Sequence, residues 1–83
     1  MSFRPGERAE LLRQGAKAAA RGDTADSNPL LLRHNLPSIT GECQRFWARR
    51  RDAWLHGWEF EAAAATLSVR MALDFREATA RLA

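Results

Sequence analysis

The hydrophobic pattern is strongest between positions 41 and 65, where apolar residues recur at intervals of three, four and seven. At about 100° per residue, one narrow wedge of a helix collects Cys43, Trp47, Trp54, Trp58 and Ala65, and an edge beside it collects Phe46, Ala53, Gly57, Phe60 and Ala64. Together they cover about half of the circumference, which is wider than one neighbouring helix needs. The pattern therefore predicts a helix over residues 41–65 that contacts two neighbours.

The N-terminus of this helix is predicted at Thr40, because threonine is a common helix cap. Gly41 and Glu42 would occupy the first turn, where a carboxylate interacts favourably with the helix dipole. Cys43 would lie in the same turn. A helix N-terminus can lower the pKa of a thiol, but the apolar neighbours of Cys43 on its stripe favour a small buried residue over a reactive thiolate.

A shorter helix is predicted over residues 5–21, after a tail at residues 1–4, and Gly22 is suited to end it. The apolar face of this helix is mostly alanine and glycine. Small side chains let another backbone approach closely. We therefore expect this face to pack against the Trp54–Trp58 face, with Gly57 near the contact.

Residues 22–40 are predicted to form a connection, because prolines and asparagines interrupt every helical period there. A connection of about nineteen residues is long for a compact domain and is typical of a functional or self-packed loop. Its apolar residues are expected to hold it over the helices; they are Leu30, Leu31, Leu32, Leu36 and Ile39.

Residues 66–83 are predicted to form a helical extension, for which two interpretations remain. Apolar residues continue at steps of three or four from Phe60 towards the C-terminus, without a glycine or proline. One interpretation is an unbroken helix, which is too long for so small a monomer to bury and implies a dimer. Its seam would contain Leu67, Met71, Phe75 and Leu82. The other is a break near Thr66, with Ser68 capping a third helix that folds back.

Length and composition indicate one small all-α domain of 83 residues, built as a short helix, a long ordered loop and a long second helix that continues into or precedes a C-terminal helix. The single cysteine excludes an internal disulfide framework and a multi-cysteine metal site. No apolar run reaches the length of a membrane span or resembles a secretory signal. We expect a cytoplasmic protein that does not bind membranes and holds neither metal nor cofactor.

The charge is uneven along the chain. Residues 1–51 contain ten Lys/Arg and five Asp/Glu, whereas residues 52–83 contain three and five, which gives +5 and −2 and sums to the net charge of +3. Arginine accounts for twelve of the thirteen basic residues, and its planar fork suits bidentate contact with phosphate. The predicted RNA-binding residues are Arg13, Lys17, Arg21, Arg45, Arg49, Arg50 and Arg51. A solvated surface is the alternative interpretation of these charges.

A spaced motif runs through the same region. It consists of Gly22, Asn28, Pro29, Trp47, Trp54, Gly57 and Trp58, of which the last three form Trp-x-x-Gly-Trp. In these residues the chain resembles the ribosome modulation factor family over residues 12–63. The segment 36–42, with Trp47, is similar to the longer branch of that superfamily, which includes small proteins described as ciprofloxacin-resistance determinants.

Two features depart from the family pattern. Leu30 stands where the family has a tyrosine, and residues 64–83 extend beyond the family's usual end. The resemblance implies a small helical protein that binds the small ribosomal subunit through ribosomal RNA and promotes inactive ribosome dimers in starved cells. It therefore leads us to expect a ribosome-associated modulator of translation that acts in a stress response.

Two other functions remain as alternatives. The first is a helical module for protein interaction or self-assembly without ribosome binding, for which the C-terminal stripe is the motivation. The second is a nucleotide-dependent phosphotransferase, an activity proposed for the longer branch, with Asp23 and Asp26 holding a magnesium ion. Because the chain has no phosphate-binding glycine loop and contains one lysine, we expect it not to be an enzyme.

Overall fold

The computed structural model describes residues 6–82, and it describes side-chain environments for residues 6–74 and 76. The elements are α1 (Glu7–Ala20), the 3₁₀ turns η1 (Ala25–Ser27), η2 (Pro29–Leu31) and η3 (Arg33–Asn35), α2 (Pro37–Thr40) and α3 (Gln44–Leu82). Every regular element in the described part is helical, so the predicted all-α class is confirmed. The predicted tail at residues 1–4 and Pro5 lie outside the described residues.

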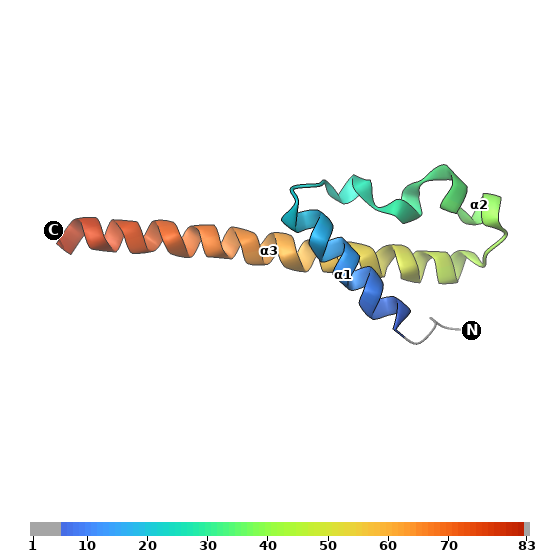
Figure 1. Ribbon diagram of the computed structural model, residues 1–83, viewed down its shortest axis with the longest axis horizontal. Helices are drawn as coiled ribbons and strands as arrows, with labels where there is room; N and C mark the ends of the chain where they lie inside the picture. The colour runs from blue at the N-terminus through green and yellow to red at the C-terminus, as the bar shows by residue number, and fades with distance from the viewer. Residues whose placement is uncertain (1–5, 83) are drawn as a thin grey trace.

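The long helix α3 organises the molecule. Helix α1 crosses it near the middle, and the connection with η1 to α2 runs back along the first half of α3 (Figure 1). The second half of α3 extends away from both, and the molecule reaches 64 Å along its longest axis. We call residues 6–62 the head and residues 63–82 the extension.

The crossing of α1 and α3 is a close contact between backbones. Gly15 lies against the carbonyl of Trp54, and Gly57 lies against the carbonyl of Leu12. A Cβ atom at either glycine would overlap backbone atoms of the other helix, which no side-chain rotation relieves. The predicted packing of the small-residue face on the Trp54–Trp58 face, with Gly57 at the contact, is therefore confirmed.

The tryptophans form the core of the head. Trp47 and Trp54 keep only 8% and 3% of their surface exposed. Trp58 is half-buried, and its indole Nε1 donates a 2.8 Å hydrogen bond to the carbonyl of Asp23, just beyond the end of α1. Tryptophan side chains from α3 thus fill the space between α3, α1 and the connection.

Asn28 fixes the connection to α3. Its buried side chain donates from Nδ2 to the Arg51 carbonyl and accepts at Oδ1 from the Leu30 N–H, both at 3.0 Å. The indole Nε1 of Trp47 donates to the Leu30 carbonyl at 2.9 Å. Through these three bonds the motif residues Asn28 and Trp47 hold the connection against α3, so both have a structural role. The motif's Gly22 has φ 88° in the turn after α1, which is a backbone conformation that glycine adopts readily.

The apolar residues of the connection contribute less than predicted. Leu30 is buried and Leu36 is partly buried against the core, but Leu31, Leu32 and Ile39 are exposed. The connection is a series of short 3₁₀ turns, in which side chains three residues apart align on one side. Neighbouring leucines therefore point in different directions, and only part of the set reaches the helices.

The predicted start of the long helix is wrong by three residues. Thr40 ends α2, Gly41 follows with φ 75°, and α3 begins at Gln44. The Thr40 hydroxyl accepts a 3.2 Å hydrogen bond from the Glu42 N–H, so it caps the turn between the helices. Pro37 is suited to begin a helix of its own, and this short helix takes the threonine that the sequence pattern assigns to the next one.

Cys43 was expected as a buried residue, and this expectation is wrong. Its side chain is exposed immediately before α3. Because the helix starts late, Cys43 lies immediately before Gln44 rather than within the first turn, outside the helical face that carries the tryptophans.

Helix α3 is unbroken, which decides between the two interpretations of the extension. No break occurs at Thr66, whose hydroxyl donates to the Ala62 carbonyl at 3.0 Å within the helix. Every described side chain from position 63 onward is exposed, including Leu67 and Met71 of the predicted seam. The side chains of Phe75 and Leu82 lie outside the described residues.

Candidate nucleic-acid interface

The structure divides the predicted RNA-binding residues into paired and unpaired groups. Arg13 contacts the Glu10 carboxylate through Nε and Nη2, with a shortest distance of 2.7 Å. This contact, followed by the one from Gln14, lowers the pKa of Glu10. Arg21 contacts the Asp23 carboxylate at 2.9 Å. Both arginines are exposed, but part of their charge is compensated locally.

Arg50 is a structural residue at the base of the head. Its Nη1 donates to Glu42 at 2.6 Å, and its Nε lies 2.8 Å from a carboxylate oxygen of Glu7 without the alignment of a hydrogen bond. These contacts join the start of α1, the turn before α3 and α3 itself. Arg50 is therefore held inside an ion-pair network.

Arg51 is also engaged. Its guanidinium lies 4.9 Å from the ring centroid of Trp47, within the range of a cation–π contact, and 3.0 Å from the Asp52 carboxylate. Its side chain covers the tryptophan core from the outside. Both Arg50 and Arg51, which were predicted to contact RNA, thus make contacts within the fold, and these contacts compete with RNA for their side chains.

Among the predicted RNA-binding residues, Lys17, Arg45 and Arg49 are exposed and make no ion pair within the described part of the chain. Arg8, which the sequence analysis did not select, has the same properties. Arg8 on α1 and Arg49 on α3 line one shallow groove together with Asp52, Ala53 and His56. We call this groove, with its five lining residues, the arginine groove. Arg45 lies one helical turn before Arg49 and extends the same face.

Sequence reasoning missed Arg8 because it is off the line that Arg13, Lys17 and Arg21 form along α1. Its role depends on how α1 crosses α3, since the crossing brings the first turn of α1 beside Arg49. The predicted contact at Gly57 fixes where the helices meet but not their angle. Predicting that Arg8 lies near Arg49 would have required the crossing angle between α1 and α3, which the sequence does not give.

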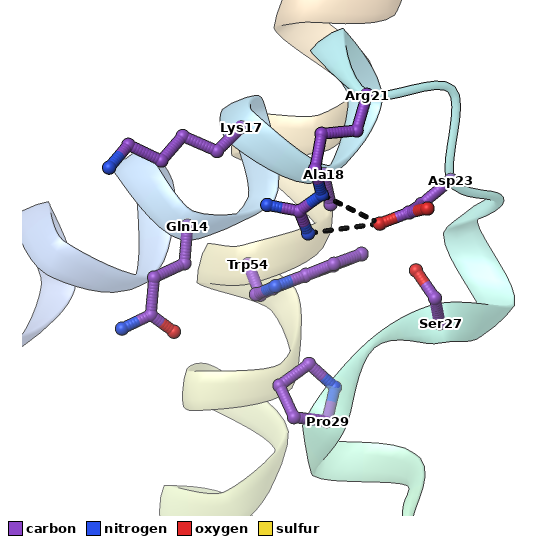
Figure 2. A pocket seen from close by; sticks show the side chains of 8 residues that line it. All are labelled: Gln14, Lys17, Ala18, Arg21, Asp23, Ser27, Pro29 and Trp54. Atoms are coloured by element: carbon purple, nitrogen blue, oxygen red, sulfur yellow. Dashed lines mark hydrogen bonds and ion pairs between the residues drawn. The ribbon is translucent and has the colours of Figure 1, made fainter.

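A second pocket lies on another face of the crossing, between α1, the connection and Trp54 (Figure 2). Its lining residues are Gln14, Lys17, Ala18, Arg21, Asp23, Ser27, Pro29 and Trp54. Figure 2 shows the guanidinium of Arg21 turned to Asp23, and Lys17 directed outward from the pocket. Because Trp54 is 3% exposed, its ring face is not available for stacking on a base.

The described residues contain no group of three or more His, Cys, Asp or Glu side chains arranged to hold a metal ion. The Asp23 carboxylate, considered above as a magnesium ligand, contacts Arg21 instead. Within the described part of the chain, no helix combines the length and the apolar character that crossing a membrane requires. The candidate binding groups on the head are therefore its exposed basic side chains.

The fold and its surface define a small, all-helical protein with a basic groove on its head. Searches of protein-family models, of curated proteins and of solved structures found no match to this chain.

Proposed function

We propose that this protein binds RNA through the sugar–phosphate backbone, with Arg8 and Arg49 as the principal contacts. The observation that supports this proposal best is the arginine groove itself. Two arginines from different helices line this one groove, both exposed and neither in an ion pair with a described residue. Like charges repel, so this arrangement is favourable when an anion lies between them.

The chemistry of the groove suits a phosphate chain. Each guanidinium can donate two parallel hydrogen bonds to one phosphate, and Arg45 adds a third cation one turn along α3. The acidic residue in the groove, Asp52, already contacts Arg51, which reduces its repulsion of a phosphate. Such contacts recognise charge and spacing rather than sequence, and their affinity falls steeply with salt.

Ribosomal RNA of the small subunit is the partner we propose, with a role in modulating translation. The support is the resemblance of Asn28-Pro29 and Trp54-x-x-Gly57-Trp58 to the ribosome modulation factor family. In this structure those residues hold the head together, so they position the groove. RNA contact is assigned to the arginines around them.

The test is sedimentation of the purified full chain with small ribosomal subunits in sucrose gradients at moderate and at high salt. The wild type is expected to comigrate at moderate salt and to dissociate at high salt. The double variant Arg8→Ala/Arg49→Ala should lose comigration, and in titrations with a labelled RNA its slope of log affinity against log salt should be smaller by about 1.5 to 2.

The matched control is Arg13→Ala/Arg21→Ala, which removes the same charge from exposed arginines that already have acidic partners. It should retain most of the binding. Unchanged comigration of the groove variant would contradict the proposed site. If the wild type binds labelled RNA but not the subunit, RNA binding stands and the ribosomal partner is wrong.

A further inference from the structure

An apolar stripe begins at Phe60, near the end of the head, and continues along the extension, and its described large side chains are not covered by their own chain. Phe60, Leu67 and Met71 keep 76%, 59% and 65% of their surface exposed. Figure 1 shows this half of α3 extending away from α1 and from the connection. A helix of about twenty residues without tertiary contacts is marginally stable in water, and most helices in proteins are stabilised by packing of an apolar face. The stripe therefore indicates an interaction surface.

The spacing of the stripe is the same on both sides of Met71. Its seven positions are Phe60, Ala64, Leu67, Met71, Phe75, Ala78 and Leu82. Steps of four, three and four residues lead from the first position to Met71, and the same steps lead from Met71 to the last. The last three positions are placed here by their sequence positions along α3. An eleven-residue repeat of this kind keeps all seven positions on one side of the helix.

We propose that two copies of this chain associate through the stripe as antiparallel helices, with the twofold axis at Met71. Each position then lies opposite the position of the partner that is equally far from Met71. Met71 lies opposite the partner's Met71, and position 67 lies opposite position 75 of the partner. Such an isologous contact matches every apolar position with another, since the spacing reads the same in both directions.

Charge selects the antiparallel orientation. Arg70 and Asp74 are exposed on one flank of the stripe, and in the antiparallel dimer Arg70 lies within about 3 Å, measured along the axis, of the partner's Asp74. Symmetry creates this opposite-charge pair twice. A parallel dimer in register would instead place Glu59 beside the partner's Glu61, where like charges repel. The partner of best complementarity is thus a second copy that runs the other way.

The opposite face of the extension is a poorer surface. Val69 and Leu73 are exposed there with 59% and 55% of their surface in water, but Thr66 and Arg76 interrupt the apolar pattern around them. Val69 therefore provides a control with the same exposure as Leu67 on a face that the dimer leaves free.

The antiparallel dimer has a geometric consequence for the heads. The arginine grooves lie about twenty residues from the twofold axis on each side, so the two grooves are about 60 Å apart at opposite ends of the dimer. Two linked binding sites raise overall affinity for a long anion without new contacts. Dimerisation itself does not depend on RNA binding, so the two proposals can fail separately.

Sedimentation equilibrium of the full chain without RNA tests the association. We expect a dimer of twice the 9.3 kDa chain mass at micromolar concentration. Met71→Glu places two carboxylates together at the axis and should raise the dissociation constant at least about 100-fold, whereas Val69→Glu should leave it unchanged. A wild type that is monomeric at every concentration, or one that Val69→Glu dissociates and Met71→Glu does not, overturns the proposal.

Disulfide formation tests the orientation, in a Cys43→Ser background because Cys43 is exposed. Chains carrying Leu67→Cys, mixed with chains carrying Phe75→Cys, should form cross-linked heterodimers upon oxidation, because these positions are opposite in the antiparallel dimer. Each variant alone should cross-link little. Efficient self-linking of Leu67→Cys without heterodimers would show a parallel dimer and overturn the antiparallel arrangement.

Discussion

The head and the extension share one helix, yet different interactions stabilise them. In the head, side chains from α3 bond to residues far away in sequence, such as Trp58 to Asp23, and two glycines allow the helices to touch. In the described part of the extension, the side-chain hydrogen bond is local, from Thr66 to Ala62. The periodicity of α3 is similar in both halves. What differs is whether another part of the same chain covers the apolar face.

This difference can be measured with two optical signals. All three tryptophans are in the head, so their fluorescence reports unfolding of the head alone, whereas far-UV circular dichroism reports both regions. Substitutions in the head should shift both signals together. Substitutions in the extension should change circular dichroism while the fluorescence transition stays in place.

The largest effect is expected for Gly57→Ala. Alanine is the better helix former by about 1 kcal/mol, so helix propensity alone predicts a more stable protein. At this position, however, the methyl group would overlap the backbone of Leu12. Overpacking costs about 1 to 3 kcal/mol and occasionally more, and an overlap with backbone atoms belongs at the upper end of this range. The free energy of unfolding of the head should therefore fall by about 2 kcal/mol in urea titrations followed by tryptophan fluorescence.

Ser68→Ala is the matched control in the extension, because Ser68 is exposed and the change improves helix propensity without a new contact. It should increase helical signal slightly and leave the fluorescence transition unchanged. If Gly57→Ala were neutral or stabilising, the close crossing of α1 and α3 would be wrong.

Asn28→Ala should have the next largest effect. It leaves the N–H of Leu30 without its acceptor in a buried site, while the Arg51 carbonyl lies within α3 and retains its helical hydrogen bond. The expected loss is about 1 to 2 kcal/mol in the free energy of unfolding of the head, measured by the same titration. Ser27→Ala removes an exposed bond from the neighbouring residue to Thr24 and should cost much less. Equal losses for both variants would contradict a special role for Asn28.

These comparisons show which features the sequence could predict. The tryptophan stripe and the small residues of α1 each follow from local spacing, and spacing was enough to place Gly57 at the crossing. The start of α3 could not be predicted from spacing. Pro37 and Gly41 define a separate short helix, and the choice between Thr40 and Cys43 as a cap depends on that competing element.

The candidate site was harder to predict than the fold. Arginine density between residues 49 and 51 is visible in the sequence, but the acidic partners of Arg50 come from Glu7 and Glu42, which only the folded chain brings near. Charge counting therefore could not show that Arg50 has acidic partners, or that Arg8 lines a groove with Arg49. Whether an arginine is available to a ligand is a property of tertiary structure.

The smallest effect is expected at Cys43, which lies in the head immediately before α3. Hydrogen bonds from the backbone N–H groups of Arg45 and then Phe46 lower the pKa of the exposed Cys43 thiol, because these groups at the start of α3 stabilise the thiolate. The rate of alkylation by iodoacetamide should therefore rise at lower pH in the folded protein than in urea.

A cysteine in the extension provides the contrast. In the variant Ser68→Cys with Cys43→Ser, the thiol lies in mid-helix, where the N–H groups are already bonded within α3, so its alkylation should follow the ordinary pKa of a thiol. Because folding lowers the pKa of Cys43, its thiolate stabilises the fold above the ordinary thiol pKa, and this contribution disappears as the pH falls through the lowered value. Identical pH profiles for the two cysteines would show that the start of α3 does not hold the thiolate.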